Sequence, residues 1–145
     1  MFAPAIQSII DARNYPTLTL AEVDEFIAAR EHVVLFFPEM MKPLPEAADV
    51  AVILGEIARS FEDQLEVAVV AWNAQRDLQL RYRFSKFPAL VFLRRGEYLG
   101  AISGVLDWGD YVIEVERLLA AEPSEPPPMN LPGAQGVAPE KGVNP

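Results

Sequence analysis

Two runs of consecutive apolar residues, separated by an amphipathic segment, constrain the fold of this chain more than any other feature. The first run spans residues 32–37 (HVVLFF) and ends at Pro38, which is typical of a strand buried on both faces. Residues 66–72 (EVAVVAW) form the second run. Between them, residues 46–62 carry apolar side chains at helical spacing: Val50, Ile53, Leu54, Ile57, Ala58 and Phe61. Strands joined through a helix lie parallel, with a right-handed crossover, so we predict a β-α-β unit.

The residues before this unit predict two helices and a short extended piece. Residues 5–13 have the apolar spacing of a helix, with Pro4 suited to its first turn. Residues 15–18 are predicted to be extended. Thr19 and Glu22 have the spacing of a capping box, which begins a helix that runs to about residue 30.

The residues after the unit predict a short helix, a hairpin and a final helix. The short helix covers residues 75–83, and the hairpin pairs residues 89–94 with 97–102 around a tight turn. Asp107 is suited to cap the final helix, where we expect Trp108 to pack in the core or as a hydrophobic staple. Its apolar face contains Trp108, Tyr111, Val112, Val115, Leu118 and Leu119.

The resulting order is α-β-α-β-α-β-α-β-β-α. It predicts an α/β fold with three α/β/α layers, in which helices cover both faces of a mixed sheet of four or five strands. Residues 1–121 form this domain. Residues 122–145 contain seven of the 13 prolines and few bulky apolar side chains, so we predict a flexible, proline-rich tail. A proline-rich ligand for an aromatic groove is the alternative, and an ordered tail would lie against a groove or a neighbouring chain.

Charge and cysteine content exclude several function classes. The chain has 12 Lys and Arg against 21 Asp and Glu, a formal net charge of −9, which disfavours nucleic acids and anionic membranes and favours a cationic partner. There is no cysteine, which removes disulfides, thiol catalysis and thiolate metal sites. We expect no targeting signal at the first residues, no membrane insertion and a cytoplasmic location.

The element order, with Phe87-Pro88-Ala89-Leu90 just before the hairpin, resembles thioredoxin. In that fold a cis-proline opens the strand beside the active site, and Pro88 matches it by position. Where thioredoxin carries its Cys-x-x-Cys motif, residues 42–47 are KPLPEA and contain no thiol. The resemblance therefore implies a thioredoxin-like scaffold without redox chemistry.

A narrower resemblance is to the hydrogenase expression/formation accessory proteins of the HyaE/HupG type, thioredoxin-like proteins that lack the redox cysteines. It is carried by residues 48–54 (ADVAVIL), the strand after Pro88, and residues 98–104 (YLGAISG) before Asp107-Trp108. This resemblance implies a non-catalytic role in the assembly of [NiFe] hydrogenase. The implied partner is the hydrogenase small subunit, bound through its twin-arginine signal peptide before export.

A binder of such a peptide needs carboxylates beside an apolar groove. Glu39, Glu46 and Asp49 could receive the arginines, although the last two also suit a helix N-terminus. Met40 and Met41 could form an adaptable contact or pack within their loop. Trp72 could line the groove or pack in the core. Phe87 and Pro88 could form the groove wall and pair with the peptide backbone.

Two other classes of function remain open. One is a redox-inactive interaction module that docks on a folded subunit or self-associates into a homo-oligomer. The other is an enzyme of different chemistry, which the sequence disfavours because it shows no cofactor motif, no metal-ligand cluster and a single histidine, His32, without a spaced partner. We therefore predict a protein that is not an enzyme and needs no cofactor or metal.

Overall fold

The computed structural model describes residues 2–39 and 44–128. Its elements follow the predicted order: α1 (Pro4–Arg13), β1 (Thr17–Leu18), α2 (Leu20–Ala28), β2 (His32–Phe37), α3 (Pro45–Ser60), β3 (Glu66–Val70), a 3-10 helix η1 (Trp72–Ala74), α4 (Gln75–Tyr82), β4 (Ala89–Arg94), β5 (Glu97–Ser103) and α5 (Trp108–Ala120). No helix within these two ranges is both long and apolar enough to cross a membrane.

The strands form one mixed sheet in the order β1-β3-β2-β4-β5. β2 and β3 are parallel, as predicted for strands joined through a helix, and β1 is parallel to β3. β4 is antiparallel to both β2 and β5. The prediction of a mixed sheet with a late antiparallel hairpin is therefore confirmed.

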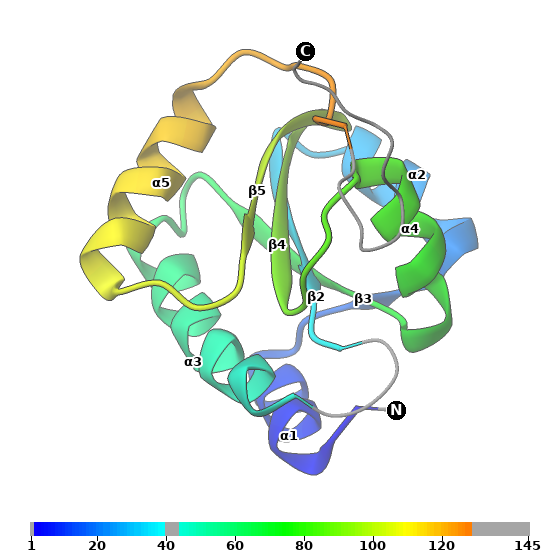
Figure 1. The fold of residues 1–145 in the computed structure, drawn as a ribbon, viewed down its shortest axis with the longest axis vertical. Helices are drawn as coiled ribbons and strands as arrows, with labels where there is room; N and C mark the ends of the chain where they lie inside the picture. Colours follow the sequence, from blue (N-terminus) through cyan, green and yellow to red (C-terminus); the bar gives the residue numbers. More distant parts are fainter. Residues whose placement is uncertain (1, 40–43, 129–145) are drawn as a thin grey trace, which may run out of the picture.

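Helices cover both faces of the sheet, which gives the predicted three layers (Figure 1). α1, α3 and α5 pack on one face, against a buried cluster that includes Val34, Phe36 and Phe92. α2 and α4 pack on the other, against Val33, Leu35 and the strand residues beside them. The runs predicted at residues 32–37 and 66–72 form β2 and β3, and β3 ends at Val70. Both strands are buried because each lies between two helical layers.

Local interactions and backbone conformations define where several of the helices begin and end. The Glu22 carboxylate accepts a hydrogen bond from the Thr19 main-chain N–H at 2.8 Å, so the capping box forms as predicted. α1 and α4 both end at a residue in the left-handed conformation, Asn14 (φ 60°) and Arg83 (φ 61°). Asp107 occupies the N-cap position of α5, but its side chain makes no capping hydrogen bond.

Both tryptophans correct the expectations from sequence. β3 ends at Val70, so Trp72 does not end the strand; it begins η1 with its side chain 49% exposed. Trp108 is 44% exposed at the start of α5, where packing in the core or as a staple was expected. Both residues lie at helix starts beyond the end of a strand, and none of the described residues buries them fully. An apolar pattern along the chain cannot distinguish such a position from the core.

Candidate functional site

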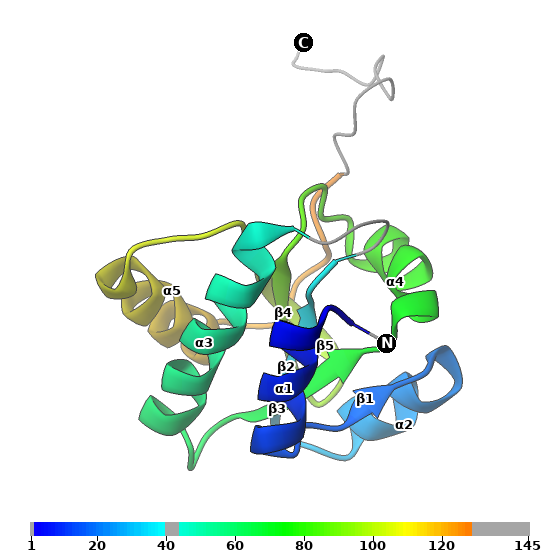
Figure 2. The same cartoon turned by 90° about the horizontal axis from the view of Figure 1, so that it is seen from below.

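Four segments meet at the carboxyl ends of the parallel strands β2 and β3, the end of the sheet seen in Figure 2. Phe37 pairs with Ala89, so Pro88 and the residues after β2 lie at the same end. Phe36 pairs with Val69, which brings η1 there, and Ala89 pairs with Ser103, which brings the loop after β5. We call this end of the molecule the strand end.

A cis peptide bond precedes Pro88, as the resemblance to thioredoxin implied. The Gly104 main-chain N–H donates to the Pro88 carbonyl oxygen at 2.9 Å, and the Tyr111 hydroxyl donates to the Gly104 carbonyl at 3.2 Å. Gly104 has a φ of 75°, a conformation that favours glycine. These bonds fix the turn after β5 against Pro88 and leave Val105, which follows it, 44% exposed.

Glu39 is the most unusual residue of the strand end. It lies two residues beyond β2 and is only 5% exposed. Its Oε1 atom is buried and accepts no hydrogen bond from any residue that the structure describes. An unpaired buried carboxylate is unfavourable by at least about 1–3 kcal/mol, so this atom is a strong candidate to accept a donor from a partner molecule.

Gln75 is a second buried polar side chain at the strand end, and the sequence analysis missed it. Its Nε2 atom donates to the Val70 carbonyl at the end of β3, at 3.1 Å. Its Oε1 atom is buried without a hydrogen-bond partner among the described residues. A polar residue at the first position of a short helix gives no burial signal in sequence. Val105 was also missed, although the glycine turn after the hairpin could have indicated it.

Phe87 presents both an aromatic side chain and free main-chain groups. Its half-buried ring packs edge-on against Phe84, with ring centroids 5.2 Å apart, and against Phe37 at 6.5 Å. Within residues 2–39 and 44–128, no main-chain group bonds to the Phe87 main-chain N–H or C=O. An extended peptide could therefore pair with this position as an added strand.

The other site residues predicted from the sequence are Glu46, Asp49, Met40 and Met41. Glu46 lies in the first turn of α3 and is exposed, and Asp49 is exposed one turn later. Both carboxylates are accessible, and the N-terminal position of Glu46 also suits the helix dipole. Met40 and Met41 lie outside the described residues.

The described residues at the two ends of the sheet contain no candidate metal cluster. In the described ranges, no group of three or more His, Asp or Glu side chains could hold a metal ion. His32 lies at the opposite end of β2, paired in register with Arg94, with its Nε2 atom buried and unpartnered. The chain also has no thiol that could act where thioredoxin carries its cysteines. The strand end therefore offers carboxylates, a free main-chain edge and exposed apolar side chains, which suit binding.

Comparison with known proteins agrees with this arrangement. The germline-specific thioredoxin Deadhead of Drosophila melanogaster superposes with a TM-score of 0.58 and 20% identity over 71% of this chain and 97% of that protein. This likeness shows the thioredoxin-like fold. The hydrogenase expression/formation protein HoxO of Azotobacter vinelandii is 39% identical over 99% of this chain and 93% of its own length.

A second relative, the hydrogenase expression/formation protein HupG of Rhizobium leguminosarum bv. viciae, is 29% identical over 81% of each chain. The family described as hydrogenase-1 expression protein HyaE matches residues 6–111. This range includes all five strands, β1 to β5, together with the cis-proline and the turn that follows β5. The thioredoxin-like fold, the missing cysteines and these matches lead to one conclusion: the chain belongs to the HyaE family of hydrogenase expression proteins, which act in hydrogenase maturation.

Proposed function

We propose that this protein is a non-catalytic chaperone of hydrogenase maturation, which binds the twin-arginine signal peptide of the hydrogenase small subunit in the cytoplasm before export. The peptide lies across the strand end. One of its arginines pairs with Glu39, its backbone pairs with Phe87, and its apolar segment contacts Trp72 and Val105.

The buried Oε1 atom of Glu39 is the observation that carries this proposal. A carboxylate only accepts hydrogen bonds, whereas a guanidinium only donates them, in a planar geometry that matches two carboxylate oxygens. An unsatisfied carboxylate oxygen favours a ligand rich in donors, as an arginine side chain is.

The surroundings of Glu39 favour a peptide over a free cation. Added-strand pairing at Phe87 needs an extended backbone. Trp72 and Val105 are exposed apolar side chains, as is Trp108 at the start of α5, and they would contact the apolar part of a signal peptide. The net charge of −9 accelerates encounter with a basic peptide at low salt.

The direct test is capture of the small subunit with and without its signal peptide. We expect a complex only when the signal peptide is present. Equal binding of a subunit that lacks the signal peptide would contradict the proposal and support an interaction module that docks on the folded subunit.

A matched pair of variants tests the role of Glu39. Glu39→Gln and Glu62→Gln each remove one negative charge, but Glu62 is an exposed residue after α3. We expect Glu39→Gln to weaken signal-peptide binding by about 30-fold or more, which is the loss typical of a broken buried charge pair. Glu62→Gln should leave the affinity within about twofold, because an exposed charge contributes little to binding. Equal effects of the two variants would exclude Glu39 as the arginine receptor.

A further inference from the structure

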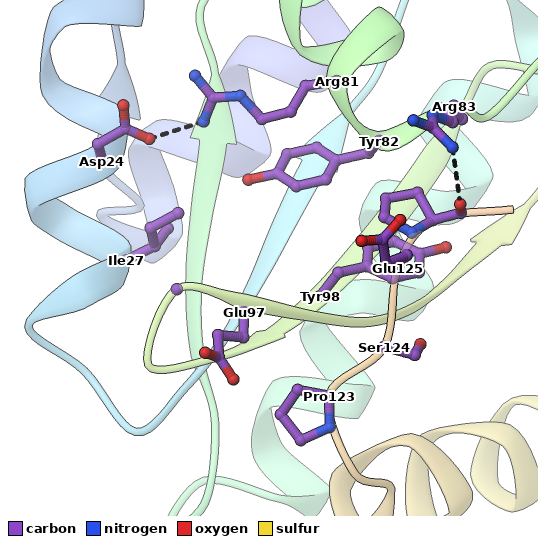
Figure 3. A pocket seen from close by; sticks show the side chains of 12 residues that line it. Asp24, Ile27, Arg81, Tyr82, Arg83, Glu97, Tyr98, Pro123, Ser124 and Glu125 are labelled. Atoms are coloured by element: carbon purple, nitrogen blue, oxygen red, sulfur yellow. Dashed lines mark hydrogen bonds and ion pairs between the residues drawn. The ribbon is translucent and has the colours of Figure 1, made fainter.

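A groove of about 630 Å³ lies at the other end of the sheet, beside the β4–β5 turn (Figure 3). α2 contributes Asp24 and Ile27, and the end of α4 contributes Arg81 and Tyr82. β5 contributes Tyr98, whose ring stacks on that of Tyr82 with an interplanar angle of 15° and centroids 6.1 Å apart. The groove therefore has two stacked aromatic rings at its base and an ion pair between Asp24 and Arg81 at its rim.

The chain's own residues 123–126 line this groove. Two hydrogen bonds hold them there: the Ser124 main-chain N–H donates to the Tyr98 carbonyl oxygen at 2.9 Å, and the Arg83 Nη1 atom donates to the Pro126 carbonyl oxygen at 3.1 Å. The first bond occupies the outer edge of β5, which otherwise pairs only with β4 in the part of the chain that the structure describes.

The exposure of this segment has the period of a polyproline II helix, which has three residues per turn. Pro123 and Pro126, three residues apart, are half-buried, whereas Ser124 and Glu125 between them are exposed. Pro-rich segments in this conformation bind aromatic grooves at a low entropic cost because proline is already restricted. The groove supplies the two elements that such recognition needs, stacked aromatic rings and a donor for a proline carbonyl.

We propose that the surface between α4 and β5 is a specific docking site for an extended, proline-containing segment, and that residues 123–126 of the same chain are docked there and form one wall of the groove. This docking covers the edge of β5 at Tyr98 and the tyrosine pair. We call residues 123–126, the first part of the proline-rich tail, the strap. Release of the strap would open both the edge and the aromatic groove to a proline-containing segment of another protein. The proposal does not depend on the peptide site at the strand end.

Hydrogen exchange of the Ser124 amide in the full-length chain tests the docking. We expect exchange about tenfold or more slower than in an unstructured peptide, because a hydrogen bond to Tyr98 protects the amide. The rate should not depend on protein concentration. Exchange at the unstructured rate would overturn the proposal, and protection that grows with concentration would overturn docking within one chain in favour of exchange between two copies.

Two glycine variants of the full-length chain separate recognition from general stability. Arg83→Gly removes the guanidinium that binds Pro126, while glycine tolerates the φ of 61° at this helix end. Asn14→Gly is the matched control, since Asn14 ends α1 with a φ of 60° and lines no part of the groove. Loss of Ser124 protection in Arg83→Gly alone supports the proposal. Equal protection in both variants would overturn it.

A peptide added in trans tests the chemistry of the ligand. The peptide AEPSEPPP repeats residues 121–128 and is added to full-length Arg83→Gly and to full-length Ser124→Pro, whose strap lacks the N–H that binds Tyr98. We expect the nuclear magnetic resonance signals of Tyr82 and Tyr98 to shift in Ser124→Pro, where Arg83 is retained, and to shift less in Arg83→Gly. A peptide with its prolines replaced by alanine should give smaller shifts. Equal shifts with the two peptides would overturn recognition of proline.

Discussion

Three carboxylates at the two ends of the sheet differ in whether they have partners. At the end of the β4–β5 turn, Glu31 accepts from Arg95 at 2.7 Å and from Arg94 at 3.1 Å, and Asp24 pairs with Arg81 at 2.6 Å (Figure 3). At the strand end, Glu39 and Gln75 each bury an oxygen without a donor from the described residues. Apolar side chains show the same contrast, because Trp72 is exposed at the strand end whereas Tyr82 is buried near the turn.

This difference marks the strand end as the place where a buried carboxylate oxygen lacks a donor from the described residues. Buried polar groups in folded proteins are nearly always hydrogen-bonded, so two exceptions at one sheet end indicate a site. At the turn end Glu31 and Asp24 are paired and residues 123–126 dock on β5, while the His32 Nε2 atom stays buried without a partner among the described residues. The contrast leads to three predictions about stability, and the largest effect comes first.

Replacing one aromatic residue at each end should give very different losses of stability. We expect Tyr82→Ala to lower the free energy of unfolding by about 3–4 kcal/mol, because Tyr82 is 5% exposed and stacks on Tyr98. Trp72→Ala should lower it by less than about 1 kcal/mol, because Trp72 is 49% exposed. Urea unfolding followed by circular dichroism measures both. A large loss in Trp72→Ala would show that Trp72 holds the fold and would contradict its availability to a partner.

Removing the charge of Glu39 should stabilise the free protein. We expect Glu39→Gln to raise the free energy of unfolding by about 1–2 kcal/mol at pH 7, because the variant no longer buries a carboxylate oxygen that lacks a donor. The same urea titration measures the change, with Glu62→Gln as the exposed control that should stay within about 0.5 kcal/mol. A clear loss of stability in Glu39→Gln would mean that Glu39 already has a structural partner in the free protein.

The same substitution at the turn end should have the opposite sign. The hydrogen bond from Arg94 lowers the pKa of Glu31 below its ordinary value, and Arg95 adds to the effect. A lowered pKa in the folded state means that Glu31 stabilises the fold at neutral pH and loses this contribution as the pH falls through the carboxyl range. Glu31→Gln should therefore be slightly less stable than wild type at pH 7 and equal to it near pH 3. An equal difference at both pH values would exclude these charge-assisted bonds as the cause.

The sequence predicts the fold well because each element carries its own local signal. The apolar run of residues 32–37 and the capping box at Thr19 correspond to elements of the structure within two residues. The mixed sheet follows from the order of these elements, whereas the cis bond before Pro88 was implied only by the resemblance to thioredoxin. These features depend on periodicity and on residues near each other in the chain.

The candidate site is less predictable because it depends on which strand ends meet and on what covers them. Glu39 was selected for its charge, yet its burial and its unpartnered atom follow only from the structure. Gln75 was missed because its role depends on the Val70 carbonyl at the end of another element. The sequence left Trp72 open between the groove and the core and placed Trp108 in the core or in a staple, because an apolar side chain alone does not indicate how much of it is covered.

Titration of the small-subunit signal peptide against the full-length protein tests the central claim most directly. Isothermal titration calorimetry would compare the natural peptide with one in which both arginines are glutamine and one in which both are lysine. The account predicts binding of the natural peptide, much weaker binding with lysine because lysine lacks the planar pair of donors, and no measurable binding with glutamine. Equal affinity for the arginine and glutamine peptides would contradict the claim that the strand end recognises the paired arginines.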